Sequence, residues 1–258
     1  MLSVILFAAL FASSWILFRS KARKPNVSTN VLFITAHPDD ELMFFGPTLL
    51  NEIRWRLQSS SNSKVHLLCL SNGNFYGDGN KRTDELDSAC KFLLDYCQTG
   101  LNGHQQDDNA FVWKVINNTH LPDSPAIDWP SDLIRQIVID YVKQNDISRV
   151  ITFDQYGISG HSNHIAIYET LKNCLDSSIQ LWLLESVSLF RKYLSAFDLL
   201  FTCISSLYRN NWNIYFLSLF DYLYLVQALR RHQSQMLWFR YLYSSTSRYM
   251  FINTLSKN

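Results

Sequence analysis

The sequence lacks several features that mark common classes of protein. Its 258 residues carry 23 Lys and Arg against 22 Asp and Glu, so it has no basic surplus to build a nucleic-acid groove. It contains no internal repeat and no low-complexity tract. The five cysteines are an odd number without a C-x-x-C pair, and they lie mostly in apolar periodic segments. This favours buried free thiols over a zinc–thiolate or redox site. We expect a reducing compartment and no nucleic-acid partner.

One long apolar run stands at the start of the chain. Residues 2–18 are broken only by three serines, and about 17 residues is the short edge of what can span a bilayer as a helix. The basic cluster at 19–24 follows this run instead of preceding it, which argues against a cleaved signal peptide. By the positive-inside rule, the rest of the chain then stays in the cytosol. We expect a transmembrane anchor with a basic flank over residues 1–24. A cleaved signal or a peripheral helix is the alternative.

The remainder, residues 25–258, is expected to form one catalytic domain. Short apolar runs typical of buried strands alternate with segments of 3.6-residue periodicity typical of helices. The expected strands are 31–35, 65–70, 111–115, 149–153 and 181–187, and the expected helices are 47–57, 83–97 and 132–143. This alternation predicts an α/β fold, a Rossmann-like and mostly parallel sheet with helices on both faces. Ligands of such folds bind at the carboxyl ends of the strands.

The first expected strand is followed directly by Ala36-His37-Pro38-Asp39-Asp40-Glu41, an imidazole and three carboxylates within five residues. Clustered carboxylates repel one another unless a cation or solvent relieves them. On its own, this segment fits a metal site and a solvated acidic turn that caps the next helix equally well.

A second polar cluster favours the metal site. After the expected strand 149–153 come Asp154 and then Gly160-His161-Ser162-Asn163-His164. Two histidines three residues apart at a helix start lie on one face. Two imidazoles and one carboxylate match a catalytic zinc site, which keeps a position open for water. A nearby unligated carboxylate can take a proton and a further imidazole can stabilise an oxyanion, so the chemistry is expected to be hydrolytic.

The two motifs, A-H-P-D-D-E and G-H-S-N-H, resemble those of the LmbE-like, PIG-L type, zinc de-N-acetylases, and the likeness extends from about Val31 to the end of the chain. The resemblance implies the LmbE-like fold and assigns a role to each motif position. It implies His37, Asp40 and His164 as ligands of Zn²⁺, Asp39 as general base, and His161 as the group that meets the oxyanion or protonates the amine. Glu41 would support the site or cap a helix. Another divalent metal, iron, manganese or cobalt, also suits such ligands.

Two further segments resemble the family. The loop Ser71-Asn72-Gly73-Asn74 and an R-x-x-E helix imply that Asn72 and Arg82 bind the substrate, with Arg82 on its sugar or phosphate. A surface pair of Arg82 with Glu85, one helical turn away, is the alternative. Bacterial relatives often have Asp where Asn163 stands, which leaves open what tunes His161. Asp154 is one candidate.

The C-terminal part, residues 189–258, is rich in aromatic residues and leucine. Its segment 214–229 is too short, with Asp221 at its centre, to be a good membrane span, so a buried core segment is favoured over an interfacial patch. Residues 230–249 mix basic and aromatic residues as helices at a bilayer surface do, although they could equally close the core.

The resemblance and the expected anchor together imply an enzyme that acts on a glycolipid. The expected reaction is hydrolysis of the N-acetyl amide of N-acetylglucosaminyl-phosphatidylinositol to glucosaminyl-phosphatidylinositol and acetate, in GPI-anchor biosynthesis. The expected place is the cytosolic face of the endoplasmic reticulum membrane, with a single membrane pass. A de-N-acetylase of a soluble amino sugar is one alternative, and a non-catalytic, metal-binding membrane module that holds a glycolipid is another.

Overall fold

The computed structural model describes residues 27–59, 61–99, 107–124, 126–209 and 212–258. The expected membrane anchor over residues 1–24 lies outside these ranges. No helix within them is both long and apolar enough to cross a membrane.

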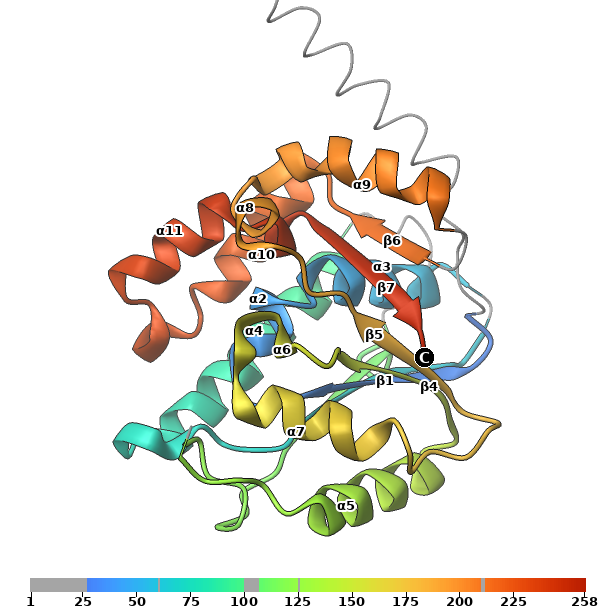
Figure 1. The fold of residues 1–258 in the computed structure, drawn as a ribbon, viewed down its shortest axis with the longest axis vertical. Coiled ribbons are helices and arrows are strands. Elements are labelled where there is room, and N and C mark those ends of the chain that lie inside the picture. Colours follow the sequence, from blue (N-terminus) through green and yellow to red (C-terminus); the bar gives the residue numbers. More distant parts are fainter. Residues whose placement is uncertain (1–26, 60, 100–106, 125, 210–211) are drawn as a thin grey trace, which may run out of the picture.

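A seven-stranded sheet organises the described chain (Figure 1), with the strand order β3-β2-β1-β4-β5-β7-β6. The strands are β1 (Asn30–Thr35), β2 (Val65–Cys69), β3 (Phe111–Val115), β4 (Ile147–Phe153), β5 (Gln180–Leu184), β6 (Trp212–Phe216) and β7 (Ile252–Lys257). Strands β1 to β5 pair in parallel, whereas β7 is antiparallel to both β5 and β6. The expected mostly parallel sheet is confirmed. The antiparallel edge comes from the C-terminal part, for which no strand was expected.

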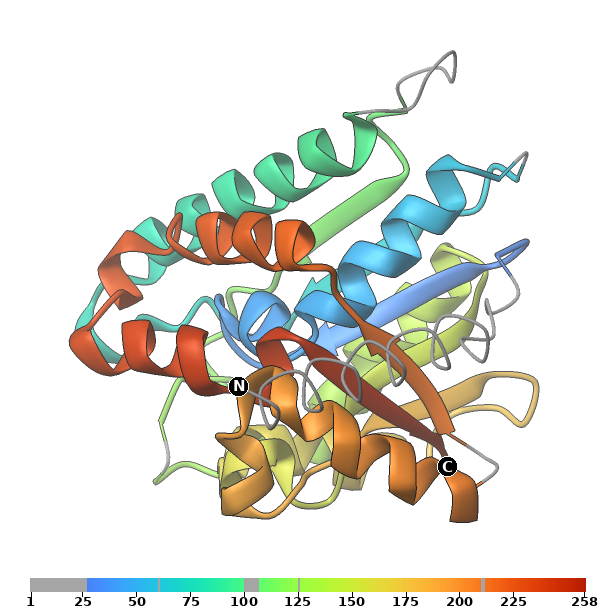
Figure 2. The ribbon, with the colours of Figure 1, turned by 90° about the horizontal axis from the view of Figure 1, so that it is seen from above.

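Helices cover both faces of the sheet, as expected (Figures 1 and 2). On one face α3 (Gly46–Leu57), α4 (Gly79–Gln98) and α10 (Leu219–Leu229) pack together, and α5 (Ser131–Gln144) packs on α7 (Ser162–Leu171) on the other. The other α-helices of the described ranges are α2 (Asp40–Met43), α6 (Gly157–Gly160), α8 (Leu189–Lys192), α9 (Asp198–Tyr208) and α11 (Trp238–Thr246). Helix α4 begins at Gly79, four residues before the expected start, because Asn74 Oδ1 accepts from the Gly79 amide.

The core lies around β1, whose residues from Val31 to Ile34 are at most 1% exposed. A strand covered on both faces must be apolar throughout, which explains the unbroken apolar run. The five cysteines are free thiols. Burial raises the pKa of Cys69 and Cys90 well above its usual value, as expected for structural thiols.

A buried polar network joins the parallel strands to the C-terminal part. Glu52 on α3 forms ion pairs with Arg56 and with Arg149 on β4. The Tyr215 hydroxyl on β6 donates to Glu52 Oε1 over 2.8 Å. Because the Glu52 side chain is fully buried, its charge depends on these partners for compensation.

The segment 214–229 is not one continuous element, so neither expectation for it holds throughout. It contains the end of β6 and all of α10, with a turn between them. Asp221 forms a capping box with Ser218 at the start of α10 and an ion pair of 2.6 Å with Arg54. One face of α10 is buried through Leu225 and Leu229, while the other exposes apolar residues such as Phe220.

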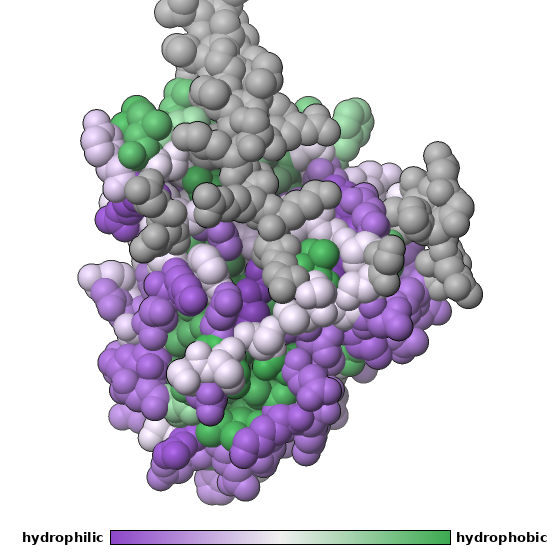
Figure 3. Space-filling view, turned by 90° about the vertical axis from the view of Figure 1, so that its right-hand side faces the viewer, coloured by the Kyte–Doolittle hydropathy of each residue, from purple (hydrophilic) through white to green (hydrophobic). Residues whose placement is uncertain are grey.

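Exposed apolar side chains are unevenly distributed. Among the described residues, all but four of the large exposed hydrophobic side chains lie at Leu189 or beyond. Figure 3 shows the face on the right-hand side of Figure 1, where hydrophilic residues surround one hydrophobic patch in the lower half and further hydrophobic residues gather near the top. The aromatic C-terminal part is therefore only partly used to fill the core.

Candidate metal centre

The two polar motifs meet at one edge of the sheet. His37 to Glu41 follow β1, and the segment from Asp154 to His164 follows β4, the parallel neighbour of β1. The carboxyl ends of adjacent parallel strands lie side by side, so their loops converge. The His161 ring centroid is 5.0 Å from that of His37 and 4.9 Å from that of His164. The expected convergence is confirmed.

The expected ligand set is assembled. His164 Nε2 lies 3.3 Å and His37 Nδ1 lies 3.8 Å from Asp40 Oδ2. All three residues are buried, and each offers a ligand atom within 4.8 Å of the others. The backbone amides of Ala36 and His37 donate to Asp40 Oδ2 over 3.0 and 2.8 Å, which fixes the carboxylate at the end of β1.

The orientation of His164 leaves one nitrogen available. Its Nδ1 bonds to the Gly157 carbonyl over 3.0 Å, and its ring stacks on Phe153 at 3.9 Å. Gly157 has φ +56°, and a Cβ there would lie 2.9 Å from His164 Cβ, so this close approach requires glycine. His164 Nε2 is buried and makes no hydrogen bond. A buried nitrogen beside a carboxylate oxygen is what a bound divalent metal would satisfy, so the residues fit such an ion.

The pKa shifts of the three residues also fit a bound divalent metal. Burial lowers the pKa of His37 to about 4 against the opposing effect of Asp40 and Asp123, so this imidazole is neutral at neutral pH. Burial would raise the pKa of Asp40, but His164 and His37 hold it well below its usual value. Burial disfavours a charged His164, yet Asp40 outweighs that effect and raises its pKa. The Asp40–His164 pair therefore favours a positive charge between its members, either a proton or a metal ion.

Asp39 stands beside the ligand set without belonging to it. Its φ of +108° is unusual for a residue other than glycine and is the kind of strain that collects at functional sites. Its amide donates to Glu41 Oε2 over 3.0 Å. Its Oδ2 lies 2.7 Å from Arg240 Nη2 and its Oδ1 lies 3.9 Å from Arg82 Nη2. Burial raises the pKa of Asp39, and Arg240 opposes this rise. The carboxylate lies outside the expected ligand set, and the two guanidiniums compensate its charge.

Glu41 supports the same turn. Its Oε1 pairs with His232 Nε2 over 2.7 Å, and both side chains are fully buried. Since Glu41 also holds the Asp39 amide, this pair links the metal-site turn to the segment between α10 and α11. The expected supporting role of Glu41 matches these contacts.

Asp123 is a site residue that the sequence motifs do not reveal. Its Oδ1 lies 3.3 Å from His37 Nε2, and its Oδ2 pairs with Arg82 Nη1 over 2.8 Å. With His37 and His161 it forms a second group that could hold a metal ion. Asp123 lies in the loop after β3 and belongs to no recognisable motif. Its place beyond the end of a parallel strand is the one signal that could have drawn attention to it.

Arg82 organises the site, and its surface pair with Glu85 does not form. Its guanidinium donates over 2.8 Å to each of the Gly73 and Pro38 carbonyls and to Asp123. Glu85 instead accepts from the amide and hydroxyl of Ser234. The two residues are 6% and 8% exposed, which is inconsistent with a solvated pair. Substrate contact by Arg82 stays a prediction.

Asn72 is the other residue expected to bind substrate. Its amide nitrogen donates to Asn117 Oδ1 over 3.0 Å, in the loop that follows β3. This bond ties the loop after β2 to the loop after β3. Its contact with a substrate also stays a prediction.

The surroundings of His161 differ from expectation. Asp154 accepts from the hydroxyl and amide of Ser186, so it does not tune His161. His161 Nδ1 accepts from the Asn163 amide over 3.3 Å, while the Asn163 side chain reaches His37 Nε2 at 3.0 Å. Burial, helped by His164, lowers the pKa of His161. A neutral His161 that accepts at Nδ1 carries its proton on Nε2, where it can donate.

Fold and site together define a class of protein: an α/β protein in which strand-end loops build a His/Asp cluster fit for a divalent metal, with an unligated carboxylate beside it. Residues 32–175 match the family described as PIG-L, GlcNAc-PI de-N-acetylase. The chain belongs to this family of deacetylases.

Relatives agree with this assignment. N-acetylglucosaminyl-phosphatidylinositol de-N-acetylase of Bos taurus is 36% identical over 92% of this chain and 86% of its own length. A Schizosaccharomyces pombe protein named "Probable N-acetylglucosaminyl-phosphatidylinositol de-N-acetylase" is 36% identical over 99% and 97%. N,N'-diacetylchitobiose deacetylase of Pyrococcus horikoshii has a TM-score of 0.53 and 14% identity, covering 89% of this chain and 84% of that one. A zinc-inhibited teicoplanin deacetylase has a TM-score of 0.57 and 12% identity, covering 89% and 97%. The solved structures share the fold.

Proposed function

We propose that this chain hydrolyses the N-acetyl amide of N-acetylglucosaminyl-phosphatidylinositol to release acetate and glucosaminyl-phosphatidylinositol, a step of GPI-anchor biosynthesis. The observation that carries the proposal is the buried His37–Asp40–His164 cluster with the unligated Asp39 beside it. The relatives at 36% identity over most of the chain carry the name of this activity and support the choice of substrate.

His37, Asp40 and His164 would hold the metal, which we propose is zinc. When bound, such an ion supplies a Lewis acid that polarises the amide carbonyl and makes water a better nucleophile. Asp39 takes the proton of the attacking water, and the pKa-raising effect of its burial suits a base that works near neutral pH. Arg240 and Arg82 limit that rise by keeping positive charge beside the carboxylate.

His161 serves the other end of the reaction. Because its Nδ1 accepts from the Asn163 amide, its Nε2 carries the proton that can be donated to the developing oxyanion or to the leaving amine. His161 is less buried than the three proposed ligands, which leaves it within reach of a substrate. Arg82 and Asp123 hold the loops around Asp39 and His161 in place.

We further propose that the enzyme works at the cytosolic face of the endoplasmic reticulum membrane, attached by a helix within residues 1–24. The exposed apolar side chains of α8 to α11 support a surface at the lipid interface, because large exposed apolar patches mark interaction sites. A substrate with a phosphatidylinositol tail is presented in that plane.

The test is acetate release by the full chain in membranes, with synthetic N-acetylglucosaminyl-phosphatidylinositol and a soluble N-acetylglucosamine oligomer offered side by side. The proposal expects release from the lipid in preference to the oligomer. Release from the oligomer alone would indicate that the enzyme deacetylates a soluble amino sugar and not the lipid. Binding of the lipid without release from either compound would indicate a binding module.

A further inference from the structure

A cavity of about 300 Å³ adjoins the metal centre on the side of the C-terminal part. Phe44 forms one wall, and its ring packs edge-on against His164 at 5.6 Å. Arg240 forms another wall, and its guanidinium pairs with Asp39. The cavity therefore shares its walls with one proposed metal ligand and with the proposed base, although it is a separate space.

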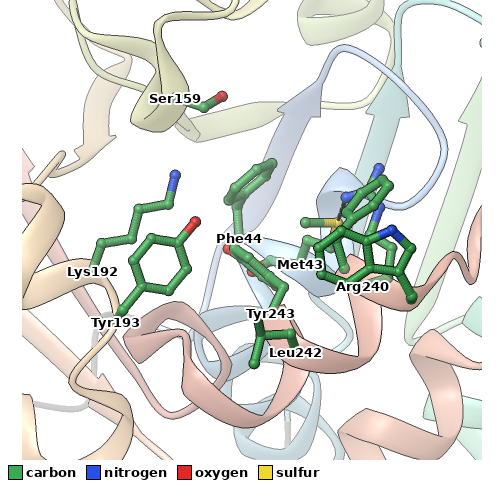
Figure 4. A pocket seen from close by; sticks show the side chains of 10 residues that line it. Met43, Phe44, Ser159, Lys192, Tyr193, Arg240, Leu242 and Tyr243 are labelled. Atoms are coloured by element: carbon green, nitrogen blue, oxygen red, sulfur yellow. Dashed lines mark hydrogen bonds between the residues drawn. The ribbon is translucent and has the colours of Figure 1, made fainter.

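A buried cation faces this cavity. Lys192 at the end of α8 is 9% exposed, and in Figure 4 its ammonium points, with the Tyr193 hydroxyl, toward the space between Phe44 and Ser159. None of the ion pairs among the described residues includes Lys192, whose charged group meets only the Tyr193 ring at 5.9 Å. Burial lowers the pKa of this ammonium, as expected for a cation without a counter-ion.

The carboxylate of α9, the helix that follows α8, offers Lys192 no ion pair. Asp198 is the carboxylate of the neighbouring helix, and it is already paired with Arg191 at 2.7 Å and with Arg248 at 2.9 Å. Two arginines therefore share this carboxylate, and no ion pair of the described residues joins it to Lys192. A largely buried ammonium without a counter-ion is costly unless an anion from outside compensates it.

The mouth of the cavity is apolar. Trp238 and Leu242 on α11 line it and are 78% and 55% exposed. Leu189 and Phe190 on α8, the helix that also carries Lys192, are 72% and 66% exposed. An anion bound inside would thus have apolar groups between it and solvent, an arrangement that suits an amphiphile better than a free ion.

We propose that this cavity is the subsite for the phosphodiester of the lipid substrate, with Lys192 as the residue that neutralises it and the exposed residues of α8 and α11 beside the acyl chains. The inference rests on the proposed function and names how the substrate is held. In that substrate the inositol ring and part of the sugar separate the phosphate from the acetamide. The anion site should therefore adjoin the metal centre without coinciding with it.

The test compares Lys192→Met with wild type on three substrates. These are N-acetylglucosaminyl-phosphatidylinositol, its deacylated glycerophosphate form, and a long-chain alkyl N-acetylglucosaminide that has a chain but no phosphate. Methionine keeps the apolar stem and removes the charge. We expect kcat/KM to fall roughly ten- to a hundredfold more on the two phosphate-bearing substrates than on the alkyl glycoside, the value of a hydrogen bond to a charged group. Lys192→Arg should restore most of the loss.

Lys143→Met, an exposed lysine on α5 at the other face of the sheet, is the matched control and should leave all three values near wild type. Equal losses on all three substrates with Lys192→Met would overturn the proposal, because they would indicate a structural role. A loss confined to the acylated phosphate substrate would overturn it as well, since it would indicate a contact with the chains.

Calorimetric titration with glycerophosphoinositol separates this inference from the proposed activity. Binding that wild type shows and Lys192→Met lacks supports the subsite even if the lipid releases no acetate. Activity on the lipid with no effect of Lys192→Met on either readout would leave the deacetylase standing and remove the subsite.

Discussion

The residues up to 188 and those from 189 onward differ in how many large apolar side chains they expose. The first region buries polar groups, including His37, Asp40 and His164, at the ends of parallel strands. The second exposes apolar groups such as Trp238 on helices that cover one end of that site. Burying polar groups is costly unless they act together, whereas exposing apolar ones is costly unless something covers them. Under the proposed function, the first region would supply the chemistry and the second would meet the substrate and its membrane.

The two regions meet at a few buried charged contacts. Arg240 reaches Asp39, and His232 reaches Glu41. Tyr215 reaches Glu52. Each contact ends on a carboxylate of the first region, so the geometry of the proposed site depends on the C-terminal part being in place. The following substitutions test that division, from the largest expected effect to the smallest.

His164→Ala tests the first region at its centre. Loss of the nitrogen that faces Asp40 removes a ligand, so we expect loss of bound metal and a fall in activity of at least about 10³-fold, since a metal contributes several kcal/mol to such a reaction. Metal content and acetate release measure the two effects. The exposed His120→Ala is the control, and an active, metal-loaded His164→Ala would exclude the ligand set.

Asp39→Asn separates proton transfer from metal binding. The amide keeps the size of the side chain but cannot take a proton, so activity should fall by about 10²- to 10⁴-fold while the metal stays bound. Titration of the metal content tests whether the metal stays bound, and kcat measures the loss of activity. The exposed Asp108→Asn serves as control. Retained activity in Asp39→Asn would remove Asp39 from the role of base.

Glu52→Gln tests whether the two regions are one folding unit. It leaves Arg56 and Arg149 buried without their carboxylate, and breaking a buried pair costs about 3 to 5 kcal/mol of the free energy of unfolding. Denaturant unfolding measures the loss. Glu169→Gln removes an exposed partner of Lys172 and should stay close to wild type. Similar small changes in both variants would mean that the network does not couple the regions.

Arg240→Met tests the contact between α11 and the catalytic carboxylate. Without the guanidinium, Asp39 keeps only the more distant Arg82 as a cation, so we expect kcat to fall roughly tenfold with the metal content unchanged. Arg230→Met, exposed at the end of α10, is the control. An unchanged kcat would mean that the C-terminal part contributes to substrate binding but not to the action of Asp39.

The first region could be predicted from sequence because its features are local. The unbroken apolar run 31–35 predicts β1, and the polar motif follows it without a gap, so topology alone brings His37 and Asp40 to the carboxyl edge. The spacing of His161 and His164 places His161 at the N-cap of α7 and His164 in its first turn. Periodicity and strand order were sufficient to predict that the two motifs meet, whereas the roles of their residues came from the resemblance to the family.

The second region could not be predicted in the same way because its contacts join residues far apart in the chain. Arg240 meets Asp39 across about two hundred residues, and no local pattern marks either as a partner of the other. Asp123 likewise becomes a site residue only when the loop after β3 folds back on Arg82. Strand β7 is held by pairing with β5 and the edge strand β6 by pairing with β7, since their own sequences alternate weakly.

Metal-dependent acetate release from N-acetylglucosaminyl-phosphatidylinositol tests the proposed function most directly. The membrane-inserted full chain would be stripped of metal, assayed, and assayed again after addition of zinc, beside Asp39→Asn treated identically. We predict that zinc restores release in the wild type and not in Asp39→Asn. A stripped protein that releases acetate as fast as the zinc-loaded one, or a zinc-loaded wild type that releases none, would contradict the proposed function.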